Sequence, residues 1–159
     1  MNTRIISCIA AVLVSFILHP IAAHARIGET IAECEARYGK GEAFKGRYIF
    51  KKAPMTIACK FTNDICESMM IFHTKTDQFR HPAEMSEVEI EVLLEANGQG
   101  SAWTKVEAVS VNKEWKTEDG RVRAAYYTFS RELYIITSAE MERDAAAKAA
   151  EEKAKLKGF

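Results

Sequence analysis

The chain has 159 residues, of which 22 are basic and 22 are acidic, so its formal net charge is zero. This balance lacks the basic excess of a nucleic-acid-binding protein, and we expect no nucleic-acid partner. The length predicts one domain with room for a hydrophobic core.

The first 25 residues have the pattern of a secretory signal peptide. Arg4 gives a positive start, Ile5 to Leu18 is a largely apolar run, and Ala23-His24-Ala25 is a small-x-small cleavage site. We therefore expect cleavage near Ala25 and export to the periplasm or the medium. The remaining 134 residues carry 21 basic and 22 acidic side chains, and we expect no transmembrane segment in this mature chain.

Residues 27–74 predict a helix followed by three antiparallel strands. Thr30 and Glu33 have the spacing of a capping box, and Gly39 provides a left-handed stop, so the helix is predicted over 31–38. The strands are predicted over 47–52, 55–61 and 65–73, with a turn at 62–64.

After a polar linker over 74–84, residues 85–138 predict the same order of elements. Ser86 and Glu89 repeat the capping box, and Asn97-Gly98 ends the second helix. Three more strands are predicted over 106–115, 121–129 and 132–138, with an Asp-Gly hairpin turn between the first two.

The chain therefore predicts an α+β fold with internal duplication. Two helix-plus-three-strand antiparallel units share one sheet of about six strands, with both helices on one face, because neither unit alone buries enough apolar surface. The single domain is expected over 26–138. A third capping-box pattern, Thr137 to Glu140, opens an Ala/Lys/Glu-rich C-terminal helix or tail over 139–159. We expect it to be solvated; the alternative is a docking or dimerising helix anchored by Leu156 and Phe159.

Three cysteines follow the expected cleavage site, which suits one disulfide and one free thiol in an oxidising compartment. Cys34 lies on the apolar stripe of the first helix, and Cys59 alternates with inward-facing residues of a strand. These positions favour a helix-to-sheet bridge from Cys34 to either Cys59 or Cys66. A Cys59–Cys66 hairpin bridge is the alternative. No histidine at ligand spacing accompanies the cysteines, so no metal site is predicted.

The sequence contains no hydrolase elbow, phosphate-binding loop or dinucleotide fingerprint, so we predict no catalytic residue and no cofactor. Trp103, Trp115 and Tyr126 are the candidate binding residues, because Trp and Tyr dominate interface hot spots. The alternative is that the two tryptophans cap the core of the second unit.

The tandem order of a helix and a meander of strands resembles β-lactamase inhibitor proteins and small periplasmic outer-membrane assembly lipoproteins. The helix is matched by IGETIAECEARYG, and the turn with its following strand is matched by KFTNDICESMMIF. No lipid-modified Cys begins the mature chain, which separates it from the lipoproteins. The chain is more closely similar to a group of uncharacterised secreted bacterial α+β proteins. Four stretches carry this resemblance: IGETIAECEARYGK, SEVEIEVLLEANGQGSAW, KEWKTEDG and KAKLKGF. This resemblance implies a Cys34–Cys66 disulfide and brings no activity.

The fold resemblance implies a non-enzymatic protein-binding module that acts as an inhibitor or an assembly factor. The alternatives are a small-ligand-binding protein and an enzyme with an unrecognised site. A protein binder should expose aromatic side chains on a flat or concave surface. An enzyme should have a deep pocket in which titratable groups converge.

Overall fold

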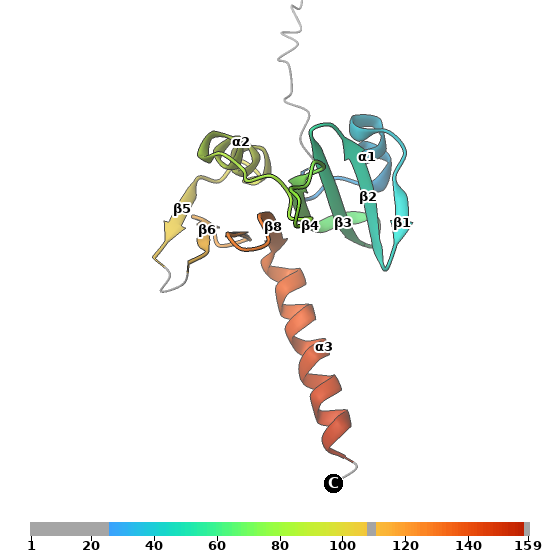
Figure 1. Cartoon of the computed structure of the whole chain (residues 1–159). Helices are drawn as coiled ribbons and strands as arrows, with labels where there is room; N and C mark the ends of the chain where they lie inside the picture. The colour runs from blue at the N-terminus through green and yellow to red at the C-terminus, as the bar shows by residue number, and fades with distance from the viewer. Residues whose placement is uncertain (1–25, 108–110, 158–159) are drawn as a thin grey trace, which may run out of the picture.

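The computed structural model describes residues 26–107 and 111–157 and has an α+β fold, as the sequence predicts (Figure 1). The expected signal peptide and the proposed anchor Phe159 lie outside the described residues. The elements in chain order are α1 (Ile31–Tyr38), β1 (Glu42–Phe44), β2 (Arg47–Lys52), β3 (Met55–Thr62), β4 (Ile65–His73), α2 (Glu87–Asn97), β5 (Trp103–Val106), β6 (Lys113–Thr117), β7 (Val122–Tyr127), β8 (Glu132–Thr137) and α3 (Ser138–Leu156).

The strands form one antiparallel sheet in the order β1-β2-β3-β4-β8-β7-β6-β5. At its centre β4 pairs with β8, and Met69 lies opposite Ile135. The described residues form eight strands rather than about six, because β1 and β5 were not predicted. The single strand predicted over 106–115 is wrong, since Val106 ends β5 and Lys113 begins β6.

The first two of the three predicted capping boxes are confirmed. In α1 the Thr30 hydroxyl accepts from the Glu33 N–H while the Glu33 carboxylate accepts from the Thr30 N–H. Ser86 and Glu89 make the same pair of bonds in α2. Each box satisfies N–H groups that have no partner within the helix, and this local chemistry fixes where the helix begins.

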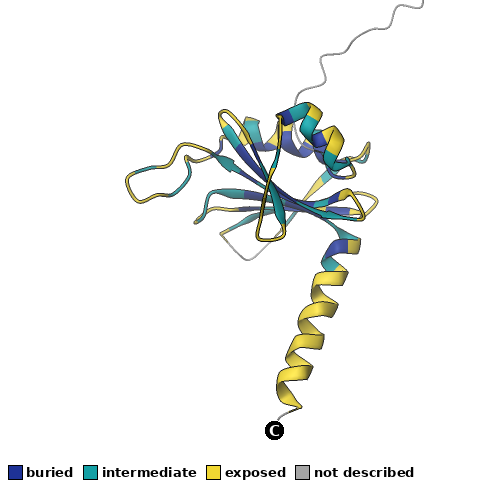
Figure 2. Cartoon of the chain, turned by 90° about the vertical axis from the view of Figure 1, so that its right-hand side faces the viewer, coloured by how far each residue is buried: buried dark blue, intermediate teal, exposed yellow. Residues whose placement is uncertain are grey.

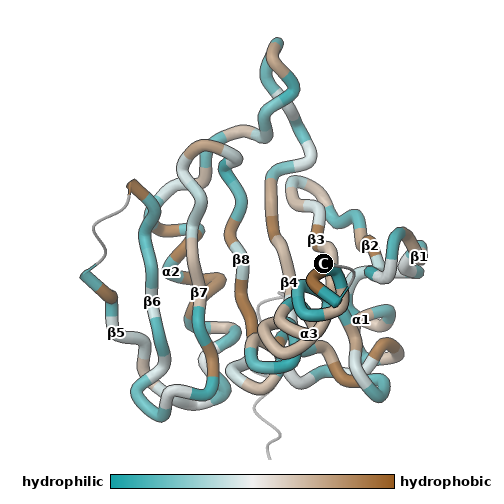
Figure 3. Tube along the Cα trace, turned by 90° about the horizontal axis from the view of Figure 1, so that it is seen from below, coloured by the Kyte–Doolittle hydropathy of each residue, from teal (hydrophilic) through white to brown (hydrophobic). Residues whose placement is uncertain are grey.

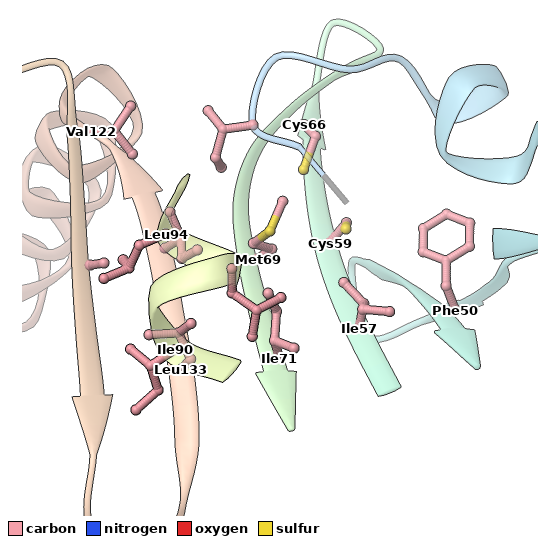
Figure 4. Close-up of a cluster of buried hydrophobic side chains, with 14 of the residues drawn as sticks. Phe50, Ile57, Cys59, Cys66, Met69, Ile71, Ile90, Leu94, Val122 and Leu133 are labelled. Carbon is pink, nitrogen blue, oxygen red and sulfur yellow. The ribbon is translucent and has the colours of Figure 1, made fainter. Parts of the chain in front are cut away.

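Helices α1 and α2 lie over one face of the sheet, and α3 projects from the opposite face (Figures 1 and 3). The core fills the space between the sheet and the two covering helices (Figure 4). Its largest fully buried apolar side chains are Tyr126, Phe50, Met69, Ile71, Ile90, Leu133, Ile135 and Val122. α1 adds Cys34 and Tyr38, and α2 adds Leu93 and Leu94, so both helices share a single core.

The helix α3 follows β8 without a loop, because Thr137 ends the strand and also caps the helix. The Thr137 hydroxyl accepts from the Glu140 N–H, 3.1 Å away. The Glu140 side chain does not return to complete a capping box; it is buried and forms ion pairs with Lys60 of β3 and Arg143. Beyond this first turn the helix is exposed, as expected for a solvated helix (Figure 2).

Candidate functional site

The structure places the two candidate tryptophans on the helix-covered face of the sheet. Register pairs Trp103 with Thr117 and Trp115 with Lys105, so both indoles point toward the side where α2 lies. The Trp103 Nε1–H donates to the Leu94 carbonyl across 2.6 Å, and both rings pack partly buried against the core. These contacts match the alternative in which the tryptophans cap the core.

Tyr126 is not available to a partner, because it is only 1 % exposed. Its hydroxyl accepts a hydrogen bond from the Met85 N–H at 3.3 Å, which ties β7 to the start of α2. The binding role expected for Tyr126 is therefore corrected to a role in the core.

Large exposed apolar side chains gather instead at the end of the sheet where β4, β5 and β7 finish. Phe79 in the 74–84 linker is 71 % exposed, Val111 before β6 is 82 % exposed, and Phe129 in the β7–β8 turn is 84 % exposed. We call these three residues and the segments that carry them the apolar loop end. Figure 3 shows the linker extending beyond the ends of the strands.

Hydrogen bonds hold the three segments of the apolar loop end together. Arg131 Nη1 donates to Asp77 Oδ2 and to the Pro82 carbonyl, each across 3.0 Å, and so joins the β7–β8 turn to the linker. The Thr128 hydroxyl donates to the Val111 carbonyl at 2.8 Å and joins the same turn to the segment before β6. The exposed side chains are thus carried on connected rather than independent loops.

Asp77 also shapes the linker itself. Its Oδ1 accepts from the Phe79 N–H at 2.8 Å and from the His81 N–H at 3.0 Å. Partial desolvation alone would raise the pKa of Asp77. The two backbone bonds and the positive charge of Arg131 outweigh it and hold this pKa below its ordinary value. The ionised carboxylate is the form that orders the turn displaying Phe79.

The sequence carried a weak indication of these residues. Phe79 stands in TDQFRHP and Phe129 in TFSRE, where a single aromatic residue is surrounded by polar and turn-forming neighbours. Such a residue has no apolar periodicity, so it has no predicted inward face. Which turns meet in space depends on the strand order, and the sequence pattern alone does not give that order.

A hollow lies on the sheet face opposite α1 and α2, beside the base of α3. It has a volume of about 260 Å³, and its lining includes Tyr127, Tyr134, Arg123, Lys116 and Met141. Among the described residues none forms an ion pair with Lys116 or Arg123. This hollow is one place that offers room for a small ligand.

The three cysteines lie together, fully buried, and all three are free thiols. The expected Cys34–Cys66 disulfide is therefore not present in the structure. Hydrogen bonding to Cys34 and then to Cys66, together with burial, raises the pKa of the Cys59 thiol, so Cys59 has both of the others as neighbours. Cys66 itself donates to the Ser68 carbonyl at 3.7 Å.

Within residues 26–107 and 111–157, no group of three or more His, Cys, Asp or Glu side chains is arranged to hold a metal ion. None of the helices in this described part is both long and apolar enough to cross a membrane.

Comparison with known proteins identifies no matching protein family and no matching curated protein. Among solved structures, the chain is similar to a cysteine-rich secretory protein from Staphylococcus aureus subsp. aureus Mu50. The identity is 13 % and the TM-score is 0.39, with 72 % of this chain and 46 % of that protein covered. The chain thus spans less than half the length of that protein.

Proposed function

We propose that this chain is an exported, non-enzymatic protein-binding module that contacts its partner through the apolar loop end. The observation that carries the proposal is the gathering of Phe79, Val111 and Phe129, all more than two thirds exposed, on three segments joined by hydrogen bonds. Exposed apolar groups gathered at one place are typical of protein-binding surfaces, and binding residues are commonly placed on loops above a rigid sheet. Export rests on the signal-peptide pattern of residues 1–25.

Preorganisation supports this assignment. Arg131 and Asp77 fix the linker against the β7–β8 turn before any partner arrives. A surface that is already ordered loses less conformational entropy on binding than a set of free loops, so more of the contact energy remains as affinity.

We also propose that the fold is a duplicated helix-plus-meander unit of the kind found in β-lactamase inhibitor proteins and outer-membrane assembly lipoproteins. Two observations support it. Each of α1 and α2 begins at its own capping box and is followed by four strands. The sheet order runs inward from both edges to the β4–β8 pair, so the last strand of one half meets the last strand of the other.

Site-specific photo-crosslinking tests the binding surface. A benzoyl-phenylalanine at position 129 should yield a discrete crosslinked protein in native periplasmic extract. The same group at Phe44 of β1, which is 59 % exposed and lies in the strand at the far edge of the sheet, serves as the matched control and should not. Adding Phe79→Ser should weaken the product at position 129. Equal products at both positions, or no product together with a small molecule that co-purifies, would overturn the proposal.

The small-ligand alternative has its own readout. Arg123→Ser and Lys116→Ser alter the hollow beside α3 and leave the apolar loop end untouched. Loss of a co-purifying small molecule in these variants, with crosslinking at position 129 absent in the parent protein, would favour that alternative.

A further inference from the structure

Three cysteines from three different elements meet in the core between α1 and the sheet. Cys34 comes from α1, Cys59 from β3 and Cys66 from β4, and each has no exposed surface. Free thiols are often buried singly as small apolar groups. Three in mutual proximity in a chain with an export signal pattern require a chemical explanation.

The strand register places Cys59 and Cys66 as near neighbours on one face. Cys59 lies opposite Met69 and Phe61 lies opposite Cys66, with a bulge between Lys60 and Phe61. Cys66 is therefore the diagonal neighbour of Cys59 across β3 and β4. Figure 4 shows the two sulfur-bearing side chains on these adjacent strands.

Cys34 approaches the same place from above the sheet. It lies on the buried side of α1 with Tyr38, while its thiol also donates toward Glu29 Oε2 at 3.9 Å. Hydrogen bonding with both of the other thiols raises the pKa of Cys59, so Cys34 and Cys66 are both its neighbours. A metal is not the explanation, because the thiols do not form a ligand set with the geometry of a metal site in the described residues.

We infer that Cys59 is the obligate member of a disulfide that forms when the exported chain folds under oxidising conditions, with Cys34 as its main partner and Cys66 as its exchange partner. The third thiol stays reduced beside the bond. This assignment differs from the Cys34–Cys66 pairing that the family resemblance implies.

The reaction is ordinary thiol–disulfide exchange with a small disulfide such as glutathione disulfide as the oxidant. One protein thiolate attacks a sulfur of glutathione disulfide, which releases one glutathione and leaves a mixed disulfide. A second protein thiolate then attacks the protein sulfur of that mixed disulfide and releases the second glutathione. The protein loses two electrons and two protons, and glutathione disulfide becomes two thiols.

The same chemistry moves the bond within the cluster. If Cys34 and Cys59 are joined, the Cys66 thiolate attacks the Cys59 sulfur, forms a Cys59–Cys66 bond and releases Cys34 as a thiol. Cys34 and Cys59 are 25 positions apart, whereas Cys59 and Cys66 are 7 apart. Closing the longer loop restricts the unfolded chain more, so the helix-to-sheet bond stabilises the folded chain more than the hairpin bond does. Diagonal cross-strand neighbours lie about 7–8 Å apart, at the upper limit of what a disulfide spans, so the helix-to-sheet bond is the favoured isomer.

Peptide mapping reads the pairing directly, because trypsin places the three cysteines in the separate peptides 27–37, 53–60 and 61–75. The reduced mature chain is refolded with glutathione and glutathione disulfide, trapped with an alkylating agent at acidic pH and digested. We expect peptide 53–60 joined to 27–37, with a minor product joined to 61–75. A dominant product of 27–37 joined to 61–75, or no joined peptides, would overturn the inference.

Single cysteine variants test whether Cys59 is the member common to both disulfides. Cys66→Ala should retain the 27–37 to 53–60 product, and Cys34→Ala should give only the 53–60 to 61–75 product. Cys59→Ala should lose all joined peptides while its circular dichroism stays native. If Cys59→Ala does not fold, the other two variants still decide, because failure of either to form its expected bond contradicts a central Cys59.

Discussion

Arg131 Nη1 lies 3.0 Å from Asp77 Oδ2, so a residue of the β7–β8 turn holds the linker that precedes α2. Arg131 takes a left-handed backbone conformation with φ of 58°, and its Nη1 also donates to the linker's Pro82 carbonyl. This contact makes the separate loops one surface. The order of this surface therefore depends on the ion pair between Arg131 and Asp77.

Asp77→Ala removes the acceptor for Arg131 and for the Phe79 and His81 N–H groups. We expect amide hydrogen exchange over 78–83 to accelerate, while the free energy of unfolding falls by only about 0.5–1 kcal/mol, since the pair is partly exposed. Partner crosslinking at position 129 should weaken. Glu118→Ala, an exposed acid in the β6–β7 turn, is the control and should change none of these. Unaltered exchange over 78–83 would show that Asp77 does not order the linker.

Asn97→Ala should destabilise the whole domain. Asn97 is fully buried, its Oδ1 accepts from the Ile27 N–H at 2.9 Å, and its Nδ2 donates to the Leu93 carbonyl at 2.8 Å. Truncation leaves the Ile27 N–H buried without a partner, and we expect a loss of about 1–3 kcal/mol in urea denaturation.

Gln99→Ala is the matched control for Asn97→Ala. Gln99 donates to the Ile27 carbonyl at 3.2 Å, yet it is an exposed residue, so water can replace its amide. We expect a change within about 0.5 kcal/mol. Equal losses in the two variants would contradict the role assigned to Asn97.

Glu140→Gln should loosen the base of α3. The Glu140 carboxylate is buried and forms ion pairs with Lys60 and Arg143, and Lys60 also reaches Asp144 at 2.8 Å. Hydrogen bonds from Lys60 to Asp144 and then to Glu140 raise the pKa of Lys60, so its ammonium stays charged. Because Lys60 is partly exposed, we expect a loss of about 2–3 kcal/mol, below the full effect of breaking a buried pair.

The control for this change lies in the same helix. Glu151 and Lys155 form an exposed i,i+4 pair at 2.6 Å. Glu151→Gln should alter the free energy of unfolding by about 0.5 kcal/mol or less. A loss at position 140 no larger than the loss at position 151 would show that the buried carboxylate does not hold the helix to the sheet.

Asp119 in the β6–β7 turn should make the free energy of unfolding depend on pH at acidic values. The Arg121 N–H, then the Thr117 hydroxyl and the Arg121 side chain, donate to its carboxylate and lower the pKa of Asp119 to about 2. A carboxyl with a lower pKa in the folded state stabilises that state above the unfolded pKa of about 3.9, and the contribution is lost as pH falls toward 2.

Asp119→Asn should therefore lower the free energy of unfolding at pH 7, and the difference from the parent protein should shrink between about pH 4 and pH 2. Denaturation at a series of pH values measures this, and an NMR titration of the Asp119 carboxyl measures its pKa. A difference that stays constant over that interval would count against the turn contacts.

The parts of the fold that depend on local chemistry were predicted well. The bounds of α1 were predicted correctly because Thr30, Glu33 and Gly39 act within one short segment. The edge strands β1 and β5 were not predicted. All three residues of β1 are exposed, so they show no alternation, and β5 was concealed by the β-branched run after Val106 that suggested one longer strand.

The candidate site was harder to predict for a different reason. Trp115 and Tyr126 were chosen for their chemical type, but strand register turns both toward the covered face, where Tyr126 becomes core. Phe79 and Phe129 lie 50 positions apart. They reach one end of the molecule only because β4 and β8 pair at the centre of the sheet.

Thr137 has one further consequence, because it serves strand and helix at once. Because no loop separates β8 from α3, the angle between α3 and the sheet follows the twist of β8. Nineteen helical residues extend about 28 Å, so a tilt of about 10° at this joint would carry the tip through about 5 Å. A fluorophore pair at Lys155 and Glu118 would convert small distortions of the sheet into a measurable change in distance.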